Sequence, residues 1–283
     1  MFRTRALSRL PEVFPRALRQ LGYVDGRNIH LEFRFAEGRE DRVRAIATEL
    51  VRSNVAVLVS EDTPAARALK DATSTIPIVI VAGDPVGTGL VASLARPGGN
   101  VTGVAGAGAD LAGKSLQLFQ ELLPSATRMG LLASRTDPFA TPFREQNRKA
   151  AATLKIQLQE LIVGGPAESE AALAKANVDG LIVQPSLATP HLAALALRAR
   201  LPTLVASTPF VRAGGLMSYA PDRDNLYEKV AAQVDKILKG ARPADLPVEQ
   251  PTKFELVINV KTAKALGLPI PPSVLARADE IFQ

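Results

Sequence analysis

The stretch Val55–Ser60 (VAVLVS) is a short apolar run, rich in β-branched residues, that ends in a polar residue. A helix-length segment follows it, then a second apolar run at Ile76–Ala82 (IPIVIVA), a loop, and a third at Asn100–Val104 (NVTGV). Apolar runs that alternate with helix-length segments are typical of buried strands in a parallel sheet with crossover helices. The stretch therefore predicts an α/β unit.

The same order recurs later in the chain, at Val178–Gln184 (VDGLIVQ), Leu201–Ser207 (LPTLVAS) and Gly215–Tyr219 (GLMSY). Two copies of one pattern predict two doubly wound α/β lobes. In proteins of this architecture a small ligand binds at the carboxyl ends of the strands, and a cleft between two lobes is a natural place for it. Lobes joined by more than one chain crossing can close around a ligand by hinge motion.

Composition excludes several classes of protein. The chain has 283 residues, no cysteine and two histidines, so thiol chemistry, disulfides and a multi-histidine metal site are not expected. No apolar run reaches the ~18–20 residues that span a bilayer. The net charge is +6, but aromatic residues that would stack on bases are few, so nucleic acid is not an expected partner. No nucleophile–base pair stands out, which favours binding over catalysis.

Several further elements follow from local patterns. Alternating residues at Ile29–Phe35 predict a half-exposed edge strand, and apolar spacing predicts helices over Val86–Ala95 and Pro272–Ile281. The proline-rich stretch Pro243–Pro251 is interpreted as an extended connector between the lobes.

One segment matches the phosphate-binding P-loop pattern, Gly108–Ser115 (GADLAGKS). It supports an alternative hypothesis, a two-lobed enzyme that uses a nucleotide. In that enzyme Lys114 would bind phosphate and Ser115 would bind Mg²⁺. Two observations argue against this hypothesis. Asp110 would place a carboxylate inside the phosphate-binding loop, and no later strand ends in the aspartate that would hold magnesium. The preferred interpretation is therefore an ordinary helix start with Lys114 on its solvated face.

Small polar residues follow the predicted strands, where a ligand would bind. At such positions Ser, Thr and Asp also serve as helix caps, so each one alone is ambiguous. The free N–H groups at helix starts suit a ligand carboxylate, and Asp222 could accept an amine. The candidate ligand-binding residues are Ser60, Asp62, Thr63, Gly83, Asp84, Ser134, Asp137, Ser186, Ser207 and Asp222.

Motifs spread along the chain resemble the ABC-transporter substrate-binding proteins of the tryptophan/tyrosine-type uptake family. They are Leu21–Asn28 (LGYVDGRN), Arg34–Gly38 (RFAEG), Thr63–Ala66 (TPAA), Ala72–Pro77 (ATSTIP), Gly83–Gly87 (GDPVG), Gly89–Gly103 (GLVASLARPGGNVTG), Gly214–Tyr219 (GGLMSY) and Pro247–Leu266 (PVEQPTKFELVINVKTAKAL).

The resemblance implies the type I periplasmic-binding-protein fold, with an N-lobe of residues 1–106 plus about 221–249 and a C-lobe of 107–220 plus about 250–283. It also implies a non-enzymatic, cofactor-free, monomeric receptor that lies outside the cytoplasm. Such a receptor takes up a small organic ligand, such as an aromatic amino acid, and passes it to a membrane permease.

The chain departs from the family pattern in three places. Glu61 and Asp62 stand where small neutral residues are usual, and Ser134 and Asp137 stand where Asn is frequent. Met1–Leu10 (MFRTRALSRL) shows neither a signal peptide nor an apolar first strand, so the first strand of the N-lobe is expected to be missing. A start of the protein further upstream would account for this; otherwise Ile29–Phe35 would move in to pair with Val55–Ser60.

Overall fold

The structure is a computed structural model that describes residues 2–3, 10–37, 39–107 and 109–283. The chain divides into two compact units, Met1–Ala107 with Asp222–Lys253 and Gly108–Pro221 with Phe254–Gln283. The chain therefore passes from one unit to the other three times. Among the described helices, none is long and apolar enough to cross a membrane.

The first unit holds one parallel sheet with the strand order β2-β1-β3-β4-β5. Its elements are β1 (Phe2–Arg3), α1 (Leu10–Gln20), β2 (Arg34–Phe35), α2 (Glu40–Arg52), β3 (Leu58–Ser60), α3 (Thr63–Ala72), β4 (Ile78–Gly83), β5 (Val101–Ala107), α9 (Arg223–Leu238) and the 3-10 turn η2 (Pro243–Asp245).

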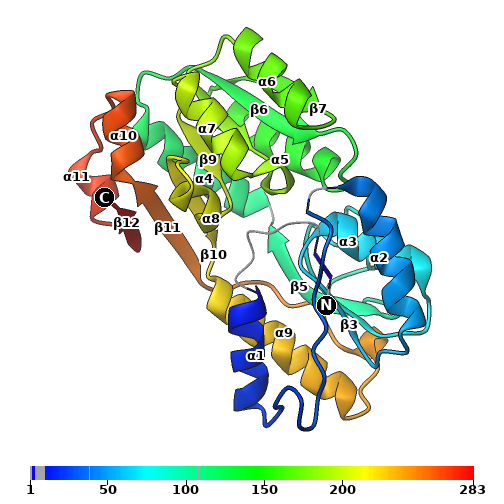
Figure 1. Cartoon of the computed structure of the whole chain (residues 1–283). Coiled ribbons are helices and arrows are strands. Elements are labelled where there is room, and N and C mark those ends of the chain that lie inside the picture. The colour runs from blue at the N-terminus through cyan, green and yellow to red at the C-terminus, as the bar shows by residue number, and fades with distance from the viewer. Residues whose placement is uncertain (1, 4–9, 38, 108) are drawn as a thin grey trace. The chain divides into compact units, whose positions relative to one another are not determined.

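Alternation along the strands sends side chains to both faces of this sheet. Leu58 and Ile78 pack with the apolar sides of α2 and α3, whereas Val59 and Val79 pack with α1 and α9. Figure 1 shows these two helix pairs on opposite sides of the strands. The predicted doubly wound architecture is confirmed for this unit.

The prediction that the first strand is missing was wrong. Phe2–Arg3 forms β1, which pairs in parallel with β2 through Phe2↔Arg34 and with β3 through Phe2↔Ser60. A central strand is needed there because its neighbours would otherwise leave unpaired backbone groups. Any short extended segment can supply those bonds, with no need for an apolar run. Met1 and residues 4–9 lie outside the described residues.

Only the end of the predicted strand Ile29–Phe35 is a strand, and it pairs with β1 rather than with β3. A side chain of the preceding turn takes up a backbone donor that a longer strand would use, because Asp25 Oδ1 accepts from the Leu31 N–H at 2.9 Å. The turn itself is held by Asn28 Oδ1, which accepts from the Val24 N–H at 2.7 Å. Such local bonds compete with a sheet ladder and shorten the strand.

The segment predicted to be the helix Val86–Ala95 consists of turns and bends. Two cations from α3 determine its course, because Arg67 donates to the Thr88 carbonyl and Lys70 Nζ donates to the carbonyls of Gly89 and Leu90 at 2.7 and 3.0 Å. Carbonyls that face α3 cannot continue a regular helical ladder. The apolar spacing of this segment reflects packing, not helix.

Residues of the proline-rich stretch Pro243–Pro251 lie along the free edge of β5 and belong to the first unit, not to a connector between the units. Thr102 Oγ1 donates to the Leu246 carbonyl at 2.7 Å. Glu249 exchanges backbone bonds with Gly103 and Ala105 at 2.9 and 2.8 Å. This stretch covers the outer edge of the sheet, which would otherwise expose unpaired groups.

The second unit holds a seven-stranded sheet of order β12-β11-β10-β9-β8-β6-β7, in which only the β10–β11 pairing is antiparallel. Its elements are α4 (Ala109–Leu122), β6 (Arg128–Ser134), α5 (Ala140–Thr153), β7 (Gln157–Val163), α6 (Pro166–Lys175), β8 (Gly180–Val183), η1 (Pro185–Leu187), α7 (Pro190–Arg198), β9 (Thr203–Val205), α8 (Thr208–Arg212), β10 (Met217–Pro221), β11 (Phe254–Asn259), α10 (Val260–Leu266), α11 (Pro272–Leu275) and β12 (Glu280–Phe282).

Helices cover both faces of this second sheet as well. Apolar residues of α6, α7 and α8 form one core with Leu132, Leu181 and Val205. On the other face Phe119 of α4 approaches so closely that a Cβ on Gly180 would lie 3.0 Å from its ring. Both units therefore have the predicted doubly wound arrangement.

The predicted helix Pro272–Ile281 is helical only over α11, and its end forms β12 instead. β12 runs parallel to β11 with Val257↔Glu280 and Ile258↔Ile281 in register. Asp279 Oδ2 accepts from the Leu256 N–H at 2.7 Å and starts this pairing. Pairing with an open sheet edge thus outweighs a local helical pattern.

Candidate ligand-binding strand ends

A buried ion pair with a tyrosine occupies the carboxyl end of β3 in the first unit. Glu61 directly follows β3, and its side chain is only 2% exposed. Its Oε1 accepts from Arg223 Nη1 and from the Tyr227 hydroxyl, the latter at 2.6 Å. Arg223 Nη1 also lies 3.1 Å from the Tyr227 oxygen. The carboxylate that departs from the family pattern is therefore neutralised within its own unit.

The pKa of Arg223 reflects two opposing causes. Burial lowers the pKa, but the Tyr227 oxygen and the Glu61 carboxylate outweigh it and hold the pKa above the usual value for arginine. The guanidinium therefore stays charged despite its burial. A buried ion pair of this kind is weak evidence for stability, since desolvation offsets much of the attraction.

Three predicted residues around the start of α3 have hydrogen bonds that shape the loop. Ser60 is fully buried, and its hydroxyl donates to the Asp62 carbonyl at 3.0 Å. Asp62 is the N-cap of α3 and accepts from the Ala65 N–H at 2.8 Å. Thr63 Oγ1 accepts from the Gly83 N–H at 3.2 Å, which joins this loop to the end of β4. The cap interpretation is confirmed for Asp62.

Asp84 organises the turn that follows β4. Its backbone has a φ of 43°, and its Oδ1 accepts from the Gly87 N–H at 2.9 Å. Thr88 donates two hydrogen bonds to the Asp84 carbonyl, one from its N–H at 2.9 Å and one from Oγ1 at 2.8 Å. The turn is thus fixed before any ligand arrives.

Asp222, the last predicted residue of this unit, is the N-cap of α9 and accepts from the Asn225 N–H at 3.1 Å. Its backbone N–H donates to the Lys253 carbonyl at 3.0 Å, which joins two of the chain segments that cross between units. Its position directly places Arg223 in the first turn of α9.

In the second unit, Gln184 joins the loops that follow β6 and β8. This fully buried side chain donates from Nε2 to Asp137 Oδ2 at 2.7 Å and accepts at Oε1 from the Ser134 N–H at 2.8 Å. Asp137 Oδ1 accepts from the Phe139 N–H at 2.9 Å. Ser134 Oγ accepts from the N–H groups of Thr136 and Asp137 at 3.2 and 3.3 Å. The predicted pair Ser134 and Asp137 is thus brought together.

The other two predicted residues of the second unit lie at neighbouring strand ends. Ser186 is in η1 after β8, and its Oγ is shielded from solvent and hydrogen-bonds to none of the described residues. Ser207 is the N-cap of α8 after β9, but its side chain makes no capping bond; its N–H donates to Ser218 Oγ at 3.0 Å.

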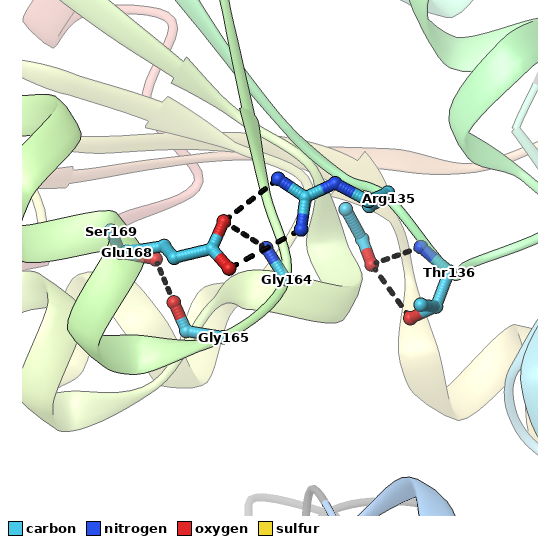
Figure 2. Close-up of polar contacts among 7 residues, drawn as sticks. Arg135, Thr136, Gly164, Gly165, Glu168 and Ser169 are labelled. Atoms are coloured by element: carbon cyan, nitrogen blue, oxygen red, sulfur yellow. Dashed lines mark hydrogen bonds and ion pairs between the residues drawn. The ribbon is translucent and has the colours of Figure 1, made fainter.

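Figure 2 shows an exposed ion pair beside the Ser134 loop. Arg135 Nη2 lies 2.8 Å from Glu168 Oε2, which also accepts from the Gly164 N–H at 3.0 Å. The Arg135 hydrogen bond, with the Gly164 N–H, lowers the pKa of Glu168, and Glu168 raises the pKa of Arg135. A Cβ on Gly164 would lie 2.8 Å from Arg135 Nη1, so a larger residue there would make the ends of these exposed side chains shift.

Known proteins share both the sequence pattern and the fold. The pattern that defines the ABC transporter substrate binding proteins matches residues 6–282. The chain belongs to this family.

Proteins of known structure or name resemble it over nearly the whole chain. A conserved domain protein from Vibrio cholerae is 30% identical with a TM-score of 0.91, over 99% of this chain and 97% of that one. A Streptococcus pneumonia protein solved with L-Trp is 28% identical with a TM-score of 0.91, over 99% and 98%. A tyrosine-binding protein from Clostridioides difficile is 28% identical over 93% of this chain and 78% of its own.

The P-loop alternative does not fit a substrate-binding protein, and the local structure contradicts it too. The positions that would form the loop around the phosphates, from Ala109 to Gly113, already lie inside α4. Ser115 Oγ donates to the Leu111 carbonyl at 2.6 Å, four residues back in the helix, and Lys114 is exposed. The helix start expected in this segment is confirmed, since α4 begins at Ala109, and Gly108 lies outside the described residues.

Sequence reasoning missed Arg223, Tyr227 and Gln184. Arg223 and Tyr227 are four positions apart at the start of a helix, so they share a face, and that spacing was a usable signal. Gln184 was taken only as the polar end of a strand. No group of three or more His, Asp or Glu side chains among the described residues could hold a metal ion.

Proposed function

We propose that this substrate-binding protein is a receptor for an aromatic L-amino acid. The observation that carries the proposal is the match to the Streptococcus pneumonia protein solved with L-Trp, which extends over 99% of this chain with a TM-score of 0.91. The tyrosine-binding relative from Clostridioides difficile supports the same class of ligand.

The chemistry of the strand ends agrees with a zwitterionic ligand. In the first unit α3 and α9 both begin at these ends, and helix starts favour a carboxylate by about 0.3–1 kcal/mol each, more when partly buried. Glu61 would oppose a carboxylate if it were unpaired, but Arg223 neutralises it. The departure at Glu61 therefore does not argue against an amino acid.

The ligand would contact the loops that contain the ten predicted residues, from Ser60 to Asp84 and at Asp222 in the first unit, and from Ser134 to Ser207 in the second. Most of their side chains fix loop shape, so the ligand would meet backbone N–H groups and the few hydroxyls left, such as that of Ser207. The protein would act outside the cytoplasm as a monomer and deliver the ligand unchanged to a membrane permease.

A thermal-shift screen against the twenty L-amino acids, D-tryptophan and ATP tests this proposal. Micromolar binding corresponds to about −8 kcal/mol, and ligand at 100 times Kd adds about 2.7 kcal/mol of stability. We expect L-tryptophan, L-tyrosine or L-phenylalanine to raise the melting temperature by several degrees. Stabilisation by ATP alone would contradict the proposal.

A further inference from the structure

Only one nitrogen of the Arg223 guanidinium, Nη1, hydrogen-bonds to residues that the structure describes. Glu61 and the Tyr227 oxygen both lie at Nη1. Within the part of the chain that the structure describes, no residue accepts a hydrogen bond from Nε or Nη2. The side chain is 20% exposed, so it is accessible to a small molecule although it is largely buried.

We propose that the Nε–Nη2 edge of Arg223 binds the α-carboxylate of the ligand, with Glu61 and Tyr227 as positioning residues. This inference rests on the proposed function and adds the group that recognises the acid end of the amino acid. The Nε–H and one Nη2–H of a guanidinium point the same way and match the two oxygens of a carboxylate.

The place of Arg223 in the fold supports this role. Arg223 is the first residue of α9 and contacts Glu61, the residue after β3, so it lies at the carboxyl edge of the first sheet. Ligands of open parallel sheets bind at this edge. The N-terminus of the sixteen-residue helix α9 adds a favourable partial charge for an anion.

The Glu61 and Tyr227 bonds explain how the charged group is held in one orientation. Both contact the same nitrogen, which fixes the plane of the guanidinium and leaves the opposite edge free. Because Glu61 already balances the charge of Arg223, an added carboxylate brings a net negative charge. A ligand that carries its own ammonium group is therefore preferred over a simple acid.

Calorimetric titration with L-tryptophan and L-tryptophanamide tests this role, because the amide lacks only the carboxylate charge. We expect the wild type to bind L-tryptophan about 100-fold more tightly than the amide. Arg223→Gln should reduce this ratio to within a few-fold, and Arg223→Lys should give an intermediate ratio because an ammonium lacks the planar edge. Tyr227→Phe should lower the ratio in part, and it should also lower the melting temperature by a few degrees because the buried Glu61 carboxylate loses a hydrogen bond.

Arg223→Gln leaves Glu61 buried without its cation and could prevent folding. The double variant Glu61→Gln with Arg223→Gln removes both charges and keeps the size of each side chain. Arg16→Gln is the matched control, since Arg16 pairs with Asp224 near the same turn of α9 but is 56% exposed. It should keep the wild-type ratio.

The outcomes separate this inference from the proposed function. If the wild type binds no amino acid, the proposed function fails and the role of Arg223 fails with it. If the wild type binds L-tryptophan but the folded double variant keeps the full preference over the amide, only the inference is overturned. A wild type that binds acid and amide equally overturns it as well.

Discussion

The Gln184 amide donates to the Asp137 carboxylate at 2.7 Å while its own oxygen accepts from the Ser134 N–H at 2.8 Å. One fully buried side chain thereby links the loops that follow two neighbouring strands, β6 and β8. A buried polar link of this kind fixes loop geometry, because breaking it leaves polar groups without partners in a low-dielectric interior.

Gln184→Leu should therefore lower the free energy of unfolding by about 2–3 kcal/mol, the cost of depriving buried polar groups of a partner. Gln184→Glu should lower the free energy of unfolding further at pH 7, because it places a second carboxylate beside that of Asp137. Two close carboxylates share a proton, so the pKa of the folded pair is raised above the unfolded value. The stability of this variant is then restored as the pH falls towards 4 and lost as it rises.

Urea denaturation at pH 4 and pH 7 measures both effects. Gln159→Glu is the control, because Gln159 lies exposed on β7 of the same sheet. If Gln184→Glu and Gln159→Glu depend on pH equally, Gln184 does not bind Asp137 as described.

A backbone contact makes Gly103 irreplaceable in the first sheet. Its φ is 142°, and an added Cβ would lie 2.1 Å from the Ile80 oxygen of the neighbouring strand. Gly103→Ala should cost about 3 kcal/mol or more, since the strands must separate and the backbone is strained. Gly99→Ala, where nothing lies within 4 Å, should change the stability by less than about 0.5 kcal/mol. Equal melting temperatures for the two variants would contradict the β4–β5 register.

Asp179 offers a test of pH dependence in the second unit. Its Oδ2 accepts from the N–H groups of Arg128 and Thr127 at 2.9 and 2.8 Å; the Arg128 bond is the main cause that lowers the pKa of Asp179. A lowered folded pKa means that the ionised group stabilises above its unfolded pKa near 4, and that this contribution is lost as the pH falls. Asp179→Asn should cost about 1 kcal/mol at pH 7 and little at pH 3.

Glu168 serves as the contrast to Asp179. Its pKa is also lowered, first by Arg135, but the pair is exposed and solvent screens it. Glu168→Gln should change the unfolding free energy much less at pH 7, as measured by the same urea titrations. A larger loss for Glu168→Gln than for Asp179→Asn would reverse this reasoning.

Lys114 tests the nucleotide alternative directly. It is an exposed residue inside α4, so Lys114→Ala should leave the Kd for L-tryptophan within about twofold of the wild type. Calorimetry with ATP should give no heat of binding for either protein. Magnesium-dependent binding of ATP that Lys114→Ala abolishes would revive the enzyme hypothesis.

The fold was predictable where burial alone determines the pattern. Runs such as Val55–Ser60 and Ile76–Ala82 are apolar because both faces of their sheet are covered, and that is visible in sequence. β1 was not predictable, since a central strand of two residues needs only backbone groups. The segment Val86–Ala95 was predicted to be a helix but forms turns, because Arg67 and Lys70 of α3 bind its backbone carbonyls. Contacts from a distant element of this kind are not visible in the local sequence.

In the candidate site, too, local features were predictable from the sequence and long-range contacts were not. Asp62 and Asp222 were recognisable as residues at strand ends because caps act locally. Glu61 and Arg223 are 162 positions apart, and only the packing of α9 against the sheet brings them together. A charge that is neutralised by a distant partner looks, in the sequence, like a departure from the family.

Titration of the purified protein with L-tryptophan in a calorimeter tests the central claim most directly. The account predicts one site per chain, a micromolar or tighter Kd, and recovery of chemically unchanged tryptophan after denaturation. The absence of heat with L-tryptophan, L-tyrosine and L-phenylalanine at concentrations up to the millimolar range would contradict it.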